Sequence, residues 1–583
     1  MAKSDSRGSS ILCSAAANLG IDTVFGLPGT QNIDLFDALR NSSIRTVLAS
    51  NDAAAAFMAN GYYRASGRPA LVVTTAGPGF AHSIPGLAEA RHDSAGMLCV
   101  VASYREAEDK QFGLQAVDVK SMADPVVKGV IEIDDASSIA GAVAEAYALA
   151  VEGEPGPVVL YIDRGALSQR SKVVGESPVT AETDSTGIDG DADRVAELIA
   201  RSKGIAIFAG QGALESSVQV RRLAEYLRCP VVTTCSGRGV LPEEHSLSYN
   251  VDFIVGHVGR VNTLFRRCDL VLALGCKFSH NGTAGFELSL PSEKLVHVDA
   301  SEEVLSSGNY PARISIKADV TLFLERLWAR HESFGRLTGG SSETAQSDSK
   351  ADLETQKRKA VPYEPGIESE AGGDLCGFFA SLNELLPDAS IIVTDAGLHQ
   401  TLTREYIRIR SPRSLIVPTD FQSTGYGLPA AIGAKLARPE SDVIAIVGDG
   451  CFAASAMELS TALREGIDLT VIVFNDQSLG SIRFQQIATF GHEFAVDLRN
   501  PDFRKLSDSL GITYFLLDRE PPIVLQECLK TEGVKLLEVR LKDSPRLSRL
   551  RNRSAAREKL SETVFGSVIR KVNRWIGILF LSG

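Results

Sequence analysis

Short apolar runs rich in β-branched residues alternate with segments of helical periodicity along most of the chain. Such runs, bounded by turn residues, are typical of buried strands, and intervening helices are typical of parallel sheets covered on both faces. The pattern therefore predicts an α/β protein with three doubly wound parallel-sheet domains. The expected strands are residues 23–25, 70–74, 98–102, 158–162, 205–208, 231–234, 270–274, 295–298, 443–447 and 469–474.

Polar stretches separate these blocks. Residues 168–193 are rich in Ser, Thr, Gly and Asp, and residues 331–373 contain few apolar side chains. Segments of that composition bury too little surface to offset their ordering entropy, which favours linkers. The predicted units are a first domain at residues 1–167, a linker at 168–193, a central domain at 194–330, a flexible connector at 331–373, a third domain at 374–541 and a basic tail at 542–583.

The tail differs from the rest of the chain in charge. From Pro545 onward it contains nine Lys or Arg residues and two Glu residues, and it ends in an apolar segment at 575–581. A basic helix with an apolar end is suited to an anionic membrane surface or to a partner protein. Packing of the same helix on the body of the chain is an equal alternative at this point.

Composition argues against several function classes. The formal net charge of −12 disfavours a nucleic-acid partner, because phosphate backbones require clustered Lys and Arg. The nine cysteines include no Cys-X-X-Cys pair, which favours reduced thiols over a disulfide frame or a zinc site. The polar N-terminus and the lack of a long apolar run predict a cytoplasmic protein without a secretion signal or membrane span.

Acidic residues follow two predicted strands of the third domain. The strand at 443–447 is followed by Asp449 between two glycines, and the strand at 469–474 by Asn475 and Asp476. Both strand ends are expected at one edge of a doubly wound sheet, where ligands bind. The two carboxylates would bind Mg²⁺, which completes its shell with phosphate oxygens and water, so a diphosphate is expected. Gly-Asp-Gly alone is better explained as a turn, but the whole arrangement favours a metal site.

This segment resembles the signature of thiamine-diphosphate enzymes, in which Gly-Asp-Gly precedes an Asn-rich end. Here 24 residues separate Gly450 from Asn475. The resemblance implies that Asp449, the side chain of Asp476 and the backbone carbonyl of Ser478 bind the metal. The family usually has Asn at the position of Asp476, and Asp is an equally competent oxygen donor.

The similarity covers nearly the whole chain except the connector and the tail. It is nearest to the acetolactate (acetohydroxyacid) synthase and 2-oxo acid decarboxylase family, whose domains are ordered pyrimidine-binding, central and diphosphate-binding. Segments at 25–29, 75–79, 395–400 and 424–434 are similar to the family's two glycine loops, diphosphate segment and aminopyrimidine segment. The implied cofactor contacts are Pro28, Gly29, Gly397, His399, Gln400, Gln422, Thr424, Gly450 and Cys451.

The implied catalytic residues are Asp52 and Gln115. In this family a glutamate hydrogen-bonds the pyrimidine ring of the cofactor as an acid–base group. The matching position, nine residues before Gly61, is Asp52, whose side chain is one methylene shorter. Misplacement by about an ångström can lower a rate on the order of 10²-fold. A role for Asp52 as cap of a helix beginning near Ala53 is the alternative. Gln115 matches a substrate-side residue, and an exposed loop amide is its alternative.

Two further positions depart from the family. Thr424 stands where relatives have a bulky apolar residue that bends the cofactor, and the smaller polar side chain weakens that wedge. In the central domain, Gly210-Gln211-Gly212 is a weak dinucleotide signal. Residues 277–281 differ from the Arg- and Asp-rich flavin contact of some acetolactate synthases, so the resemblance favours a site without FAD.

The resemblance implies a carboligase that decarboxylates a 2-oxo acid such as pyruvate and joins the product to a second carbonyl. Two alternatives stay open: a decarboxylase that releases the aldehyde, and a catalytically weakened relative that binds the cofactor. A homodimer or homotetramer is also implied, because the pyrimidine side and the diphosphate side of each site come from different subunits in this family.

Overall fold

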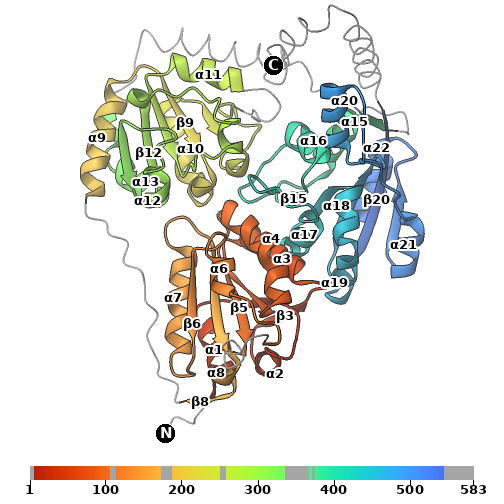
Figure 1. The fold of residues 1–583 in the computed structure, drawn as a ribbon. Coiled ribbons are helices and arrows are strands. Elements are labelled where there is room, and N and C mark those ends of the chain that lie inside the picture. Colours follow the sequence, from red (N-terminus) through yellow and green to blue (C-terminus); the bar gives the residue numbers. More distant parts are fainter. Residues whose placement is uncertain are drawn as a thin grey trace, which may run out of the picture.

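The computed structural model describes residues 6–104, 113–171, 187–249, 258–334, 367–369 and 375–543. Within them, three parallel sheets follow one another along the chain, each covered by helices (Figure 1). This confirms the predicted α/β class. The basic segment that follows Asp543 and most of the predicted connector lie outside the described residues. No helix in the described ranges is long and apolar enough to cross a membrane.

The first domain contains a six-stranded sheet with the order β3-β2-β4-β5-β7-β6, in which every neighbouring pair is parallel. Its central strands are buried, as a sheet covered on both faces requires. The strands are β2 (Thr23–Gly26), β3 (Arg45–Leu48), β4 (Ala70–Thr75), β5 (Met97–Ser103), β6 (Gly129–Ile133) and β7 (Pro157–Asp163), with a separate antiparallel pair β1 (Ser6–Arg7) and β8 (Arg170–Ser171). The helices are α1 (Gly8–Asn18), α2 (Ile33–Arg40), α3 (Asp52–Ser66), α4 (Pro78–His92), α6 (Val119–Ala123), α7 (Ile139–Val151) and α8 (Arg164–Ser168).

The central domain contains a five-stranded parallel sheet with the order β10-β9-β11-β12-β13. This domain extends beyond its predicted bounds at both ends. A helix begins at Ile188, inside the predicted linker. At the other end, a 3-10 turn at His331–Phe334 lies inside the predicted connector, and its Phe334 is buried. The elements are β9 (Ile205–Ala209), β10 (Val231–Thr233), β11 (Leu270–Leu274), β12 (Leu295–Asp299), β13 (Ile314–Lys317), α9 (Ile188–Arg201), α10 (Ser217–Leu227), α11 (Val258–Arg267), α12 (Glu302–Leu305) and α13 (Val320–Trp328).

The third domain contains a seven-stranded sheet with the path β14-β20-β18-β17-β15-β16, and β19 pairs with β20. All pairs are parallel except β14, an antiparallel edge strand within the predicted connector. The strands are β14 (Ile367–Ser369), β15 (Ile391–Thr394), β16 (Leu415–Ile416), β17 (Val443–Gly448), β18 (Leu469–Asn475), β19 (Thr513–Leu516) and β20 (Val534–Asp543). The helices are α15 (Leu375–Leu385), α16 (Leu398–Tyr406), α17 (Gly427–Ala437), α18 (Asp449–Ser455), α19 (Leu459–Arg464), α20 (Gly480–Phe490), α21 (Phe503–Leu510) and α22 (Pro521–Lys530).

Helices α3 and α17 join the first domain to the third. An added Cβ at Gly61 would overlap the carbonyl oxygen of Ala430, and one at Gly433 would overlap that of Met58, so both glycines allow the backbones to touch. Buried residues of the two helices belong to one apolar core. Figure 1 shows α3 and α4 facing α17 at this junction. The first domain is therefore fixed directly against the helix that contains most of the predicted aminopyrimidine segment.

Candidate active site

Asp449 and Asp476 lie at neighbouring strand ends of the third sheet. Strands β17 and β18 are parallel, with Gly448 opposite Phe474, so the residue after each strand reaches the same edge. Burial and then the charge of Asp476 raise the pKa of the Asp449 carboxyl to about 6. Burial also raises the pKa of Asp476. The two carboxyl groups that the sequence pairs are thus close enough to repel each other.

Amide groups hold this pair in place. The Asn500 side chain donates from Nδ2 to Asp449 Oδ2 at 2.6 Å and to Asn475 Oδ1 at 3.0 Å. Asn475 in turn donates to the buried Glu538 at 2.7 Å. The Ser478 backbone N–H donates to Asp476 Oδ1 at 3.2 Å. Each carboxylate is therefore oriented before any ligand binds.

The two carboxylates suit a cation that takes only part of its coordination shell from protein side chains. The described ranges contain no group of three or more His, Cys, Asp or Glu side chains arranged to hold a metal. Two carboxylates plus a peptide carbonyl is the kind of partial protein shell that Mg²⁺ uses, with phosphate and water filling the rest. In the part of the chain that the structure describes, the buried Ser478 hydroxyl has no hydrogen-bond partner.

His399 lies against the same edge. Its ring touches Gly448 so closely that an added Cβ there would come within 2.8 Å of Nδ1. Burial lowers the pKa of His399 to about 3, so the imidazole is neutral. Among the described residues Nε2 has no hydrogen-bond partner, although the side chain is buried. The neighbouring Gln400 instead donates from Nε2 to the Pro418 carbonyl at 3.1 Å. His399 is thus available to a ligand, whereas the amide nitrogen of Gln400 is engaged.

Asp395 holds the segment predicted to lie beneath the aminopyrimidine. It is fully buried and accepts hydrogen bonds from the backbone N–H groups of Gly427 at 2.6 Å and Gly425 at 3.2 Å. Burial raises the pKa of the Asp395 carboxyl to about 6, against the opposing effect of these bonds. The Cys451 thiol donates to the Ala396 carbonyl at 3.1 Å, so this side chain links the two predicted cofactor segments and has a partner within the protein.

The remaining predicted contacts of the third domain lie nearby in the loop before α17 and at the start of α18. Gln422 has a positive φ of 61° and donates from Nε2 to the Thr419 carbonyl at 2.8 Å. Thr424 is exposed within the chain. Gly450 donates its backbone N–H to Asp449 Oδ1 at 3.0 Å. Gly397 is the residue before α16 and has a φ of 144°, a conformation that favours glycine.

Asp52 is the first residue of α3, and its neighbour Asn51 is the cap. The Asn51 side chain accepts from the Ala54 backbone N–H at 2.9 Å, so the capping alternative for Asp52 is wrong. Asp52 Oδ1 instead accepts from Thr74 Oγ1 at 2.7 Å. Burial raises the pKa of the Asp52 carboxyl, with opposing effects from Thr74 and from the nearby His82. The Asp52 side chain therefore does not cap α3.

Gln115 connects the two glycine loops of the first domain. It has a positive φ of 58°, is exposed, and accepts a hydrogen bond from Gln31 of the opening loop. A Cβ added at Gly77, in the second glycine loop, would lie 2.6 Å from the backbone oxygen of Gln115. In the opening loop, exposed Pro28 precedes Gly29, whose backbone N–H donates to Asn32 Oδ1 at 2.7 Å. These residues gather at the carboxyl edge of the first sheet.

The predicted site residues thus form two clusters. Asp52 and Gln115 belong to the first domain, and Asp449, Asp476 and His399 to the third. Across the described ranges, no hydrogen bond or ion pair joins Asp52 or Gln115 to the two carboxylates. Each cluster thus belongs to one domain, and the described hydrogen bonds do not connect the two.

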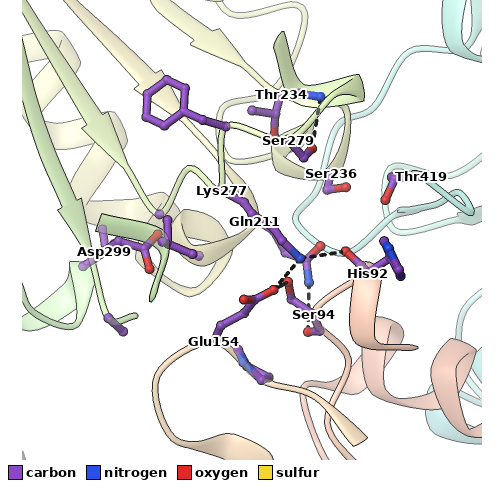
Figure 2. Close-up of a pocket in the computed structure, with 18 of the residues that line it drawn as sticks. His92, Ser94, Glu154, Gln211, Thr234, Ser236, Lys277, Ser279, Asp299 and Thr419 are labelled. Atoms are coloured by element: carbon purple, nitrogen blue, oxygen red, sulfur yellow. Dashed lines mark hydrogen bonds and ion pairs between the residues drawn. The ribbon is translucent and has the colours of Figure 1, made fainter. Parts of the chain in front are cut away.

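A cavity of about 270 Å³ lies elsewhere, among the first, central and third domains. Figure 2 shows Lys277 and Gln211 reaching across it from the central domain. Lys277 forms an ion pair with Glu154 at 2.5 Å and donates to the His92 carbonyl at 3.2 Å. Gln211 donates to the Asp93 carbonyl at 2.8 Å. None of the predicted site residues lines this cavity.

Three residues of the site had no role assigned from the sequence: Asn500, Asp395 and Glu538. Asn500 lies 51 residues after Asp449, and no local pattern in the sequence indicates the contact between the two side chains. Asp395 opens the predicted diphosphate segment, yet it binds backbone amides of the protein. Glu538 lies on β20, and nothing in its local sequence marks it.

Sequence models of three domains match the chain in order. The N-terminal TPP binding domain of thiamine pyrophosphate enzymes matches residues 6–122, the central domain of these enzymes matches 192–327, and their C-terminal TPP binding domain matches 395–539. Together these matches extend across all three sheets.

The chain is also similar to curated proteins along most of its length. The acetolactate synthase of Mycobacterium bovis is 29% identical over 536 residues, which cover 89% of this chain and 84% of that protein. A probable acetolactate synthase large subunit of Methanocaldococcus jannaschii is 29% identical over 87% of this chain and 86% of its own length. The acetolactate synthase isozyme 1 large subunit of Escherichia coli is 28% identical over 90% and 92%. The ordered domains and these full-length similarities show that the chain belongs to the thiamine pyrophosphate enzymes, as an enzyme of the acetolactate synthase kind.

Proposed function

We propose that this chain is a Mg²⁺-dependent carboligase that decarboxylates a 2-oxo acid and joins the product to a second carbonyl compound. The observation that carries the proposal is the buried pair Asp449 and Asp476, oriented by Asn500 beside a neutral His399. The names of the similar proteins, acetolactate synthases, support the carboligase reaction. A decarboxylase that releases the aldehyde and a weakened cofactor-binding relative are the alternatives.

The residues of the third domain fit a metal diphosphate. Asp449, Asp476 and the Ser478 carbonyl would hold Mg²⁺, whose remaining ligands come from the diphosphate and water. His399 Nε2, buried and without a partner in the described structure, would bond to a diphosphate oxygen. Asp395 keeps the loop carrying Gln422 and Thr424 in position.

The residues of the first domain fit acid–base and substrate roles. Bound thiamine diphosphate supplies the carbon nucleophile and the electron sink for decarboxylation. Asp52 would exchange a proton with the pyrimidine through a carboxylate oxygen, while Thr74 fixes Oδ1. Burial raises the pKa of Asp52 toward neutral pH, as an acid–base residue requires. Gln115, exposed beside the opening loop, would contact the substrate.

The reaction is tested by incubating the purified full-length chain with thiamine diphosphate, Mg²⁺ and a panel of 2-oxo acids that includes pyruvate. We expect acetolactate from pyruvate, detected by mass spectrometry. Release of acetaldehyde alone would establish the decarboxylase alternative. No product from any member of the panel, together with saturable cofactor binding, would establish the weakened relative.

Removal of one carboxylate should abolish cofactor binding. The variant Asp449→Ala leaves a single acidic ligand at the edge of β17 and β18, and it removes the acceptor of Asn500. In calorimetric titrations with thiamine diphosphate and Mg²⁺, we expect no saturable heat from this variant. Asp508→Ala, at an exposed position of α21, is the matched control and should bind as the wild type does. Retained binding by Asp449→Ala would contradict the metal assignment.

Lengthening the acid at position 52 should preserve catalysis. Asp52→Glu restores the methylene that the family glutamate has, so we expect kcat at or above the wild-type value, measured with saturating 2-oxo acid. Asp37→Glu, an exposed change on α2, controls for the substitution itself. A loss of more than about tenfold specific to Asp52→Glu would show that the local backbone has adapted to aspartate.

We also propose that the active unit is a homodimer or homotetramer. Support comes from the location of the two clusters in different domains, with no hydrogen bond or ion pair joining them among the described residues, and from apolar side chains exposed on and beside α20. These side chains are Leu479, Ile482, Phe490 and Phe494, exposed by 42%, 47%, 62% and 80%. An apolar group of this kind is suited to burial against another copy of the chain.

Mixed subunits test the shared site. Asp52→Ala and Asp449→Ala should each be inactive alone, yet co-expression should restore activity. A hybrid dimer contains one site with both defects and one intact site, so random assembly should yield about a quarter of the wild-type activity. No recovery, with hybrid dimers shown by native mass spectrometry, would contradict a site shared between subunits.

We further propose that the cavity among the three domains does not hold FAD. Two cations that line it are already paired, Lys277 with Glu154 and Arg413 with Glu215. The cavity is also lined by Asp299 and Asp319, which would repel a pyrophosphate. Titration of FAD with the full-length chain should therefore give no saturable change in flavin fluorescence. Stoichiometric quenching would refute this proposal.

A further inference from the structure

The loop between β16 and α17, residues 417–426, carries the predicted cofactor contacts Gln422 and Thr424. One of its attachments lies within the third domain, where Asp395 accepts the Gly425 backbone N–H at 3.2 Å. Gln400, also of the third domain, donates to the Pro418 carbonyl at the beginning of the loop, and Asn281 of the central domain donates to Asp420 and to the Thr419 carbonyl. Further attachments come from the first domain.

Two acids at the end of α4 in the first domain supply these attachments. Asp93 Oδ1 accepts from the Thr419 backbone N–H at 3.2 Å and from its hydroxyl at 2.6 Å. Glu89 Oε2 accepts from the Ser423 backbone N–H at 2.8 Å. Ser423 directly precedes Thr424, so Glu89 binds the loop next to its predicted cofactor contact.

Glu89 is placed where a carboxylate is poorly stabilised. Its side chain is 0% exposed, and Oε1 has no hydrogen-bond partner among the described residues. The nearby cation, Arg64 on α3, is paired with Asp93 at 3.0 Å. Tyr426, ahead of α17, also faces Glu89. Burial, and then the charge of Asp93, raise the pKa of Glu89 from 4.5 to about 8.

We propose that Glu89 is a positioning residue that holds Ser423, as a neutral carboxylic acid, and thereby sets the 417–426 loop for thiamine diphosphate. The inference rests on the proposed function of that loop. The neutral form of Glu89 is favoured because its ionisation would place a second buried negative charge beside Asp93. Arg64, the nearby cation, already forms an ion pair with Asp93. The hydrogen bonds of Ser423 favour the ionised form, but burial and the charge of Asp93 outweigh them, so ionisation of Glu89 favours a loop displaced from the first domain, where solvent reaches the carboxylate.

The sign of the pH effect follows from the pKa. The folded chain holds the Glu89 proton more tightly than the unfolded chain does. Between pH 4.5 and about 8, Glu89 therefore lowers folding stability progressively as pH rises, and above about 8 it adds no further loss. A glutamine at this position has no proton to lose, and its amide oxygen can still accept from Ser423. The Glu89→Gln variant should thus remove the pH dependence and keep the loop contact.

Hydrogen exchange of the full-length chain without cofactor tests the loop directly. We compare wild type, Glu89→Gln, Glu89→Ala and the exposed control Glu145→Gln on α7, using protection factors of residues 417–426 at pH 6 and pH 9. We expect the protection of wild type to fall from pH 6 to pH 9, and that of Glu89→Gln to stay constant between the same two pH values. Glu89→Ala should lose protection about tenfold at both pH values, because it leaves a buried N–H unpaired. If Glu89→Gln loses protection at pH 9 as wild type does, the proposal is overturned, even if Glu89→Ala does not fold.

Calorimetric titration with thiamine diphosphate and Mg²⁺ supplies the second readout. We expect Glu89→Ala to raise Kd about tenfold, and Glu89→Gln to show a constant Kd between pH 7 and pH 9 while the wild-type Kd rises. Equal binding by wild type and Glu89→Ala would overturn the positioning role alone. Absence of binding by wild type would instead contradict the proposed function, while the exchange experiment still decides whether Glu89 holds the loop.

Discussion

Two carboxyl groups lie side by side at the buried edge of the third sheet, and this pair is unfavourable by itself. Burial disfavours each charge, and the charge of Asp476 further disfavours ionisation of Asp449. The parallel register of β17 and β18 nevertheless imposes it, because the two strands end at the same edge and are followed by Asp449 and Asp476. Hydrogen bonds from Asn500 and from backbone amides offset part of the cost. A divalent cation is the partner that would offset the rest.

The other half of the proposed site depends on contacts between domains. Glycines at positions 61 and 433 let α3 and α17 touch backbone to backbone, and this contact sets the first domain against the third. The end of α4 then reaches the loop before α17 through Glu89 and Asp93. The geometry of a cofactor loop in one domain is therefore determined in part by acids of another. Asp52, one residue after the Asn51 cap, belongs to the same first-domain frame.

The sequence predicted the sheets and the adjacency of Asp449 and Asp476, because both follow from local rules. Buried parallel strands are continuous apolar runs, and the carboxyl ends of parallel strands meet at one edge. The interaction of Asn500 with Asp449 could not be predicted in this way, because it joins residues 51 positions apart. Glu89 and Ser423, 334 positions apart, are a stronger case. The alternative role of Asp52 as a helix cap was wrong by one residue, because the cap is Asn51. Asn and Asp cap helices equally well, and the sequence places the start of a helix only to within one or two positions.

The central claim is that a metal ion joins Asp449 and Asp476 to a bound diphosphate. The most direct measurement replaces Mg²⁺ by Mn²⁺ and records the electron–nuclear coupling between the ion and the phosphorus atoms of thiamine diphosphate in the presence of the full-length chain. The account requires phosphorus coupling in wild type and its loss in Asp476→Ala. A Mn²⁺ spectrum that remains that of the free hydrated ion in wild type, with protein and cofactor in excess, would contradict it.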